Sequence, residues 1–182
     1  MAKRYAEIDD KVRRFIAAQK LFFVGTAAAE GHVNVSPKGM DSLRVLAPKR
    51  VVWLNVTGSG NETAAHLLET PRITLMFCAF EGEAMILRVY GKAIAYHAHD
   101  PQWQDLISLF PQFPGARQII DVEVDLVQTS CGTAVPFFAY QGEREQLNEW
   151  AAKKGADGIR QYWQDRNQVS LDGKPTGILQ SS

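Results

Sequence analysis

The sequence has little that would place it in a membrane, in the secretory pathway or on a nucleic acid. No run approaches the roughly 18 apolar residues of a membrane-spanning helix, and the N-terminal MAKRYAEIDD lacks the apolar core of a secretory signal. Lys and Arg number 20 and so do Asp and Glu, so the formal net charge is zero. This balance argues against binding nucleic acid through bulk electrostatics. We therefore expect a cytoplasmic protein with no membrane or nucleic-acid partner.

Cysteine is scarce as well. The two cysteines, Cys78 and Cys131, lie far apart and form no C-x-x-C motif. We expect two reduced thiols, one of them buried in a strand. The four histidines show no metal-ligand spacing apart from one H-x-H pair, His97 and His99. The sequence therefore predicts neither a disulfide nor a metal site.

The apolar pattern indicates a mainly β domain. Six or seven segments read as strands in hairpin order, at residues 21–28, 32–39, 42–47, 50–56, 72–80, 83–97 and 116–132. Helical patterns interrupt them at residues 10–20, 61–69 and 100–109. Because parallel βαβ alternation is missing, we expect an antiparallel barrel with peripheral α-helices. Pro37 should end the pairing of its strand, since it has no N–H to donate.

The composition changes after about residue 140. Residues 141–154 and 157–167 read as polar helices, and GKPTGILQSS reads as a tail. With 182 residues, the chain has the length of one domain carrying an extension. We therefore assign residues 1–140 to the barrel and residues 141–182 to a helical C-terminal extension that packs on the barrel or on a partner subunit.

A glycine-rich turn between a strand and a helix is the most informative local feature. It runs from Gly58 to Thr63, after VVWLNV and before AAHLLE. The free N–H groups of a first helical turn and the helix dipole attract anions. Gly58 and Gly60 allow the backbone to take positive φ and to approach a ligand closely. The turn lacks the third glycine of a dinucleotide fingerprint and the GK[ST] of a P-loop.

The same turn has an explanation that needs no ligand. Ser59 and Glu62 have the S-x-x-E spacing of a capping box, in which side chains satisfy the first helical N–H groups. Glu62 would also repel a phosphate unless its carboxylate bonds back to the turn. From these residues alone, the turn is either an anion site or a capped helix start.

One expected strand carries a polar face. Alternation places Asn34, Ser36 and Lys38 on the same side of the segment NVSPKG. Amide, hydroxyl and ammonium groups beside a helix N-terminus would suit a phosphorylated ligand. The alternative is a solvated strand face with a surface lysine.

The order of these segments resembles the FMN-binding split barrel of the pyridoxamine 5′-phosphate oxidase superfamily. The resemblance covers about residues 6–135 and is carried by NVSPKG, by VVWLNVTGSGNETAAHL, by ETPRITLMFCAF and by the GKA within ILRVYGKAIAY. It implies a six- to seven-stranded antiparallel Greek-key split barrel. It also implies a homodimer that binds one FMN per subunit at the subunit interface.

The resemblance assigns roles to two segments. The first segment would run along the flavin, with its backbone contacting the ring. Within it, Ser36 and Lys38 would reach the ring or the phosphate. The segment comprises Val33, Asn34, Val35, Ser36, Pro37 and Lys38. The second would bind the phosphate through backbone N–H groups and the Thr63 hydroxyl; it comprises Ser59, Gly60, Asn61, Glu62 and Thr63.

The chain departs from pyridoxamine phosphate oxidases proper in its cations. Those enzymes carry Arg and Lys where this chain has Asn61 to Thr63, begin the flavin strand with Arg where it has Val33, and end in a basic signature that LDGKPTGILQSS lacks. Arg72 and Arg88 are candidate replacement cations, although each could instead form a surface ion pair. We therefore do not expect pyridoxamine phosphate oxidase activity itself.

Two functions of different classes follow. The first is an FMN-dependent oxidoreductase acting on a small molecule, in which the flavin supplies the chemistry and the protein supplies binding and orientation. The second is a split-barrel module that holds a flavin, a deazaflavin (F420) or a haem without turnover. The sequence names no catalytic acid or base, no substrate and no electron donor or acceptor.

Overall fold

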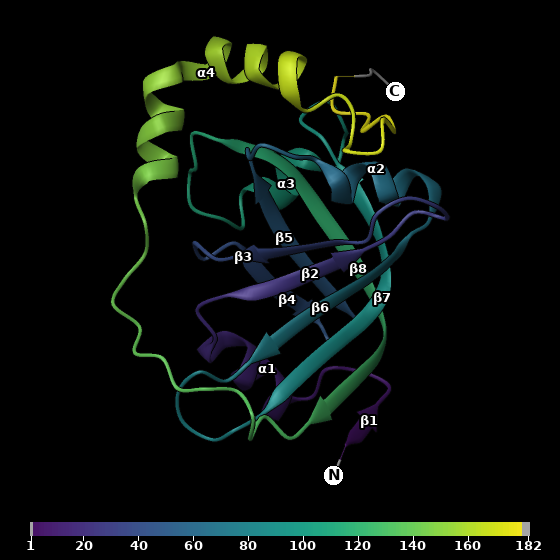
Figure 1. The fold of residues 1–182 in the computed structure, drawn as a ribbon, viewed down its shortest axis with the longest axis vertical. Coiled ribbons are helices and arrows are strands. Elements are labelled where there is room, and N and C mark those ends of the chain that lie inside the picture. Colours follow the sequence, from purple (N-terminus) through teal and green to yellow (C-terminus); the bar gives the residue numbers. More distant parts are fainter. Residues whose placement is uncertain (1, 180–182) are drawn as a thin grey trace.

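The computed structural model describes residues 2–179, and its centre is a single curled antiparallel sheet (Figure 1). The strand order is β3-β2-β6-β7-β8-β5-β4, with β1 paired to β8. The strands are β1 (Lys3–Tyr5), β2 (Phe22–Thr26), β3 (Asn34–Lys38), β4 (Leu43–Ala47), β5 (Arg50–Val56), β6 (Arg72–Cys78), β7 (Ile86–Tyr96) and β8 (Ala116–Ser130). The helices are α1 (Asp10–Ala18), α2 (Glu62–Glu69), α3 (Trp103–Ile107) and α4 (Gln146–Arg166).

This architecture confirms the predicted mainly β split barrel. Every strand pairing is antiparallel. The sheet has eight strands rather than six or seven, because β1 pairs with the far end of β8. Strand β1 was not predicted because its three residues, KRY, form a segment that is too short and too polar to show an alternation. The two cysteines are free thiols, and Cys78 is buried in β6 as expected.

Strand β3 departs from the expectation for Pro37. The β2–β3 pairing continues through Phe23 opposite Pro37 to Phe22 opposite Lys38. Pro37 is tolerated because β3 lies at the edge of the sheet and pairs only with β2. An edge strand has one side on which no N–H is needed for the ladder. The prediction that Pro37 ends the pairing was therefore wrong.

The barrel interior holds the main apolar core. It contains the fully buried side chains of Val24, Trp53, Leu75, Leu87 and Ile120. Helix α1 closes one end of the barrel with Val12 and Ile16, and Asp9 caps it by accepting the Val12 N–H at 2.7 Å. A smaller cluster fixes α3 against β5 and β8, through residues such as Trp103, Leu106 and Ile119.

Gly91 marks the centre of the long β7–β8 ladder. A β-bulge lies between Tyr90 and Gly91, where the register shifts. A Cβ at position 91 would lie 2.1 Å from the carbonyl oxygen of Glu123. Only glycine fits this close approach of two backbones, which explains the glycine of the GKA segment on physical grounds.

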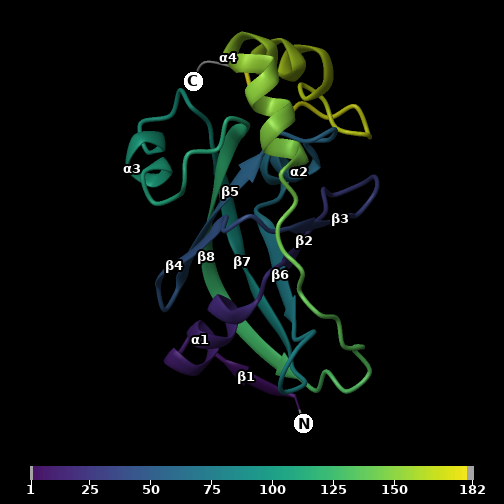
Figure 2. The same ribbon diagram turned by 90° about the vertical axis from the view of Figure 1, so that its left-hand side faces the viewer.

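The C-terminal region wraps over one end of the barrel (Figures 1 and 2). Residues 131–145 run outside the barrel to α4, which Gly155, at φ 66°, divides into the two predicted helices. The chain then returns to α2, where Thr176 and Ile178 are buried. The expectation of a tail was thus wrong for residues 173–179, and residues 180–182 lie outside the described part. None of the helices in residues 2–179 has the length and apolarity to span a membrane.

Candidate anion-binding site

The turn that precedes α2 is organised by the C-terminal segment rather than by a capping box. The N-cap residue is Asn61, and no side chain caps the helix. The Glu62 carboxylate instead accepts the backbone N–H of Leu171 at 3.0 and 3.1 Å. Neither Gly58 nor Gly60 has positive φ. The capping-box alternative is therefore excluded, the two glycines do not use the positive φ that they allow, and the first N–H groups of α2 receive no side-chain cap.

The polar face of β3 is present as predicted. Asn34, Ser36 and Lys38 are partly buried, whereas Val33 and Val35 on the other side are 71% and 66% exposed. The Asn34 amide donates to the Thr63 hydroxyl in the first turn of α2, at 3.3 Å. This contact joins the strand to the helix start, so the two segments form one surface.

A cavity of about 300 Å³ lies between these elements. Eight of its lining residues were predicted from the sequence as site residues: Asn34, Ser36, Lys38, Ser59, Gly60, Asn61, Glu62 and Thr63. The structure adds Asn55, Val56, Gly58 and Arg117. Val33, Val35 and Pro37 belong to the same segment but do not line the cavity. We call this cavity the anion pocket.

Arg117 is the lining residue that sequence reasoning missed. Its side chain is 3% exposed, and its Nη1 donates to the Gly60 carbonyl at 3.0 Å and to Asn167 Oδ1 at 2.8 Å. Both acceptors are neutral, and within residues 2–179 no ion pair involves Arg117. Burial lowers the pKa of its guanidinium to about 10. A buried cation of this kind is costly unless an anion approaches it.

Lys38 is a second cation without a carboxylate among the described residues. Its ammonium lies 5.4 Å from the centre of the Trp53 ring. Burial, and next the charge of Arg117, lower the pKa of Lys38 to about 8. The two cations therefore raise the positive potential of the anion pocket together, and each disfavours the charge of the other.

Several buried polar atoms of the lining have no hydrogen-bond partner among residues 2–179. They are Asn55 Oδ1, Asn61 Oδ1 and Arg117 Nε. Buried polar groups are almost always paired in native proteins. Their concentration around one cavity fits a polar, anionic ligand rather than an apolar one.

Asn167 holds the turn before α2 in place from the C-terminal side. Its side chain is fully buried and accepts from Arg117 through Oδ1, while its Nδ2 donates to the Gly58 carbonyl at 3.1 Å. Its own carbonyl accepts from Asn61 Nδ2 at 3.2 Å and from Thr176 Oγ1 at 2.6 Å. One asparagine thus fixes the turn, the arginine and the returning chain.

The other two predicted cations lie elsewhere. Arg72 is exposed and lines a separate surface hollow together with Val33 and Tyr90. Arg88 donates to the Ser130 hydroxyl at 3.3 Å. The structure does not bring either side chain to the anion pocket of its own chain, where Arg117 provides the second cation instead.

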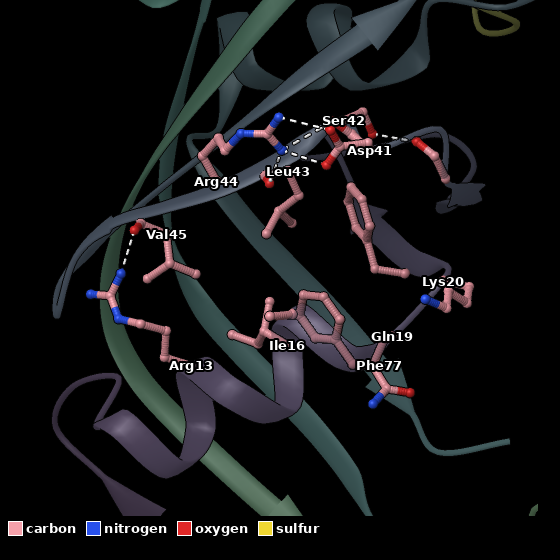
Figure 3. Close-up of a pocket in the computed structure, with 13 residues that line it drawn as sticks. Arg13, Ile16, Gln19, Lys20, Asp41, Ser42, Leu43, Arg44, Val45 and Phe77 are labelled. Atoms are coloured by element: carbon pink, nitrogen blue, oxygen red, sulfur yellow. Dashed lines mark hydrogen bonds and ion pairs between the residues drawn. The ribbon is translucent and has the colours of Figure 1, made fainter. Parts of the chain in front are cut away.

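A second cavity, of about 320 Å³, opens between α1 and β4 (Figure 3). Its floor is apolar and includes Ile16, Phe77 and Leu43. Its two arginines are partly exposed, unlike Arg117: Arg13 donates to the Val45 carbonyl, and Arg44 forms a two-pronged ion pair with Asp41. We call this cavity the α1–β4 pocket.

The match to a known protein family covers the barrel. Residues 8–131 match the family model described as pyridoxamine 5′-phosphate oxidase. The chain is 32% identical over 191 residues to the pyridoxamine 5′-phosphate oxidase family protein ustO of Aspergillus flavus, covering 94% of this chain and 76% of that protein.

Solved structures share the fold at low identity. HupZ of Group A Streptococcus has a TM-score of 0.51 at 19% identity, over 65% of this chain and 91% of that one. A Clostridium acetobutylicum protein, related to general stress protein 26 and of the pyridoxinephosphate oxidase family, has a TM-score of 0.52 at 13% identity, over 66% and 86%. By the family model and by its curated relative, this chain belongs to the pyridoxamine 5′-phosphate oxidase family.

Proposed function

We propose that the protein is an FMN-dependent oxidoreductase that binds the flavin phosphate in the anion pocket. The observation that carries the proposal is the pair formed by the buried Arg117 and the partly buried Lys38, two cations that face one cavity beside the uncapped start of α2. A phosphate dianion would supply the countercharge that the described residues do not. Membership of the family supports a flavin as the molecule that carries this phosphate.

The residues of the pocket fit distinct parts of FMN. The N–H groups of Asn61, Glu62 and Thr63 at the start of α2 would bind the phosphate, with Arg117 and Lys38 beside it. The polar face of β3 would follow the ribityl chain and the ring. Bound FMN would supply the electron and hydride transfer, while the chain binds and orients it.

We also propose a homodimer with the flavin at the subunit interface. Val35 in edge strand β3 and Val33 just before it are exposed. Exposed apolar side chains along a sheet edge are typical of a surface that another chain covers. Arg72 lies in the hollow next to Val33. Since neither Arg72 nor Arg88 reaches the pocket of its own chain, either can serve a flavin only across such an interface.

The test compares two flavins on the purified protein. FMN should remain bound through desalting, and riboflavin, which lacks the phosphate, should bind at least about 100-fold more weakly, a difference of about 3 kcal/mol. Equal affinity for FMN and riboflavin would place the phosphate outside the anion pocket. Light scattering at micromolar protein tests the dimer, and a mass near the 20.3 kDa of one chain would contradict it.

One observation favours a module that holds its ligand without turnover. The single carboxylate lining the pocket, that of Glu62, is engaged by the Leu171 N–H and faces the C-terminal segment. Anaerobic addition of reduced nicotinamide to the FMN-loaded protein separates the two functions. Bleaching of the flavin absorbance supports the oxidoreductase, whereas an unchanged spectrum supports a binding module for a flavin, a deazaflavin or a haem.

A further inference from the structure

The turn between β7 and α3 gathers three potential metal ligands. His97, His99 and Asp100 each present one ligand atom, and these atoms all lie within 4.8 Å of one another. His99 Nε2 and Asp100 Oδ1 are 3.8 Å apart. Within a tetrahedral zinc site, with bonds of about 2.0–2.2 Å, two ligand atoms are separated by about 3.3–3.6 Å. The cluster is therefore close to a metal-binding arrangement before any ion is added.

Two of the three ligands are held in place by the fold. His97 is 6% exposed, and its Nε2 lies 3.4 Å from the buried amide nitrogen of Gln118 on β8. Asp100 Oδ2 accepts the His97 N–H at 2.6 Å, and the Asp100 N–H donates to the His97 carbonyl at 3.0 Å. Gln118 Nε2 donates toward the His97 ring, and Asp100 accepts from the His97 backbone, so both the ring and the turn are fixed.

The third ligand has room to adjust. The His99 side chain is 34% exposed, and its ring centre lies 5.4 Å from that of His97. This exposure gives the His99 ring space on its solvent side. It also leaves the outer side of the cluster open to solvent, where further ligands would be water molecules.

We propose that His97, His99 and Asp100 bind one divalent transition-metal ion of the zinc type, with at least one coordination position open to solvent. Two imidazoles and one carboxylate are a ligand set that suits zinc and its neighbours rather than magnesium or calcium. The prediction of no metal site considered the H-x-H spacing without the aspartate that the turn adds to it. The inference does not rest on the proposed function.

The structure of the turn alone explains Asp100 but not His99. The Asp100 carboxylate satisfies the His97 N–H, which any such turn benefits from. Within the described turn, His99 contributes a 3.8 Å contact with Asp100 and a ring contact with His97, so His99→Ala removes a metal ligand while keeping the hydrogen bonds between His97 and Asp100. This substitution therefore separates metal binding from folding.

The test uses untagged protein, stripped with a chelator and then dialysed free of it. Titration with zinc(II) by calorimetry should give one site per chain with a Kd of about 1 μM or tighter, about −8 kcal/mol. Cobalt(II) should develop visible absorption at the same stoichiometry. His99→Ala should weaken zinc binding at least about tenfold at an unchanged melting temperature of the stripped protein, and His97→Gln should abolish it.

His32→Ala is the matched control. His32 is also an exposed histidine beside a carboxylate, with its Nδ1 2.6 Å from Asp172 Oδ1, but it belongs to no three-ligand cluster among the described residues. It should leave the zinc titration unchanged. Zinc binding that survives His99→Ala, or that His32→Ala reduces equally, overturns the proposal. The FMN titration is independent of this result, so each idea can fail alone.

Discussion

The anion pocket and the α1–β4 pocket are nearly equal in size but differ in how their arginines are buried and paired. The anion pocket measures about 300 Å³ and the α1–β4 pocket about 320 Å³. In the α1–β4 pocket, Arg44 is paired with Asp41 (Figure 3). Its guanidinium also lies over the Phe110 ring, 5.1 Å from the ring centre. In the anion pocket, Arg117 has only neutral acceptors.

This difference shows that charge satisfaction, more than volume, identifies the candidate site. A paired surface cation contributes little and calls for no ligand. A buried cation without a carboxylate carries a desolvation cost in the free protein, and an arriving anion offsets that cost on binding. The lowered pKa values of Lys38 and Arg117 express the same imbalance.

Arg117→Met should have the largest effect on FMN binding. It removes about two charge-assisted hydrogen bonds to the phosphate, at about 1.5 kcal/mol each, so the Kd for FMN should rise about 100-fold. Riboflavin affinity should change less than about threefold. The free energy of unfolding without ligand should change little, because losing a buried charge offsets the lost bonds to Gly60 and Asn167. Flavin fluorescence titration and urea unfolding measure both; a similar loss for riboflavin would contradict the assignment.

Lys38→Met should weaken FMN about tenfold and remove a pH dependence. In the wild type, the Lys38 pKa is lowered to about 8, so below that pH the ammonium is already charged when FMN binds. Above it, binding must take up a proton, so affinity should fall with rising pH until the roughly tenfold contribution of the ammonium is lost. The phosphate itself is a dianion throughout this range, since its second pKa is about 6. Titrations from pH 7 to 9.5 should slope for the wild type and stay flat for Lys38→Met.

The sequence could predict those parts of the site that depend on patterns among residues close together in the chain. Alternation places Asn34, Ser36 and Lys38 on one face of β3, and the structure has them there. The strand–turn–helix order around Gly58 to Thr63 is likewise local. The details of the turn were not predictable, because Leu171, which engages Glu62, is 109 residues away.

The missed residues depend on contacts distant in sequence. Arg117 reaches the pocket because β5 pairs with β8, in a register that puts Asn55 opposite Gln118. An arginine at the start of a strand reads as a surface residue when the partner strand is unknown. Asn167 follows a polar helix and carries no local sign of burial, yet it is 0% exposed. The only available signal was that the adjacent polar residues Arg117 and Gln118 do not follow the alternation of the rest of the strand.

Asn167→Ala should have an intermediate effect on FMN affinity, because it acts on the anion pocket through Arg117. It leaves the Gly58 carbonyl without its donor and the Arg117 guanidinium with only the Gly60 carbonyl, at a cost in stability of about 2 kcal/mol. FMN affinity should fall about three- to tenfold as Arg117 loses its fixed orientation. The exposed neighbour Gln168→Ala should change neither quantity. Thermal unfolding and FMN titration are the measurements, and an unaltered FMN affinity would confine Asn167 to a structural role.

Arg44→Met should have the smallest effect on FMN affinity, and it tests the α1–β4 pocket. Its ion pair with Asp41 is three residues apart in sequence and partly exposed, so the free energy of unfolding should fall by only about 1 kcal/mol, including the contact with Phe110. FMN affinity should stay within about twofold of the wild type, because the α1–β4 pocket supplies no unpaired charge from Arg44. A loss of FMN binding comparable to that of Arg117→Met would show that cation pairing does not distinguish the two cavities. The phosphate site would then have to be sought in the α1–β4 pocket.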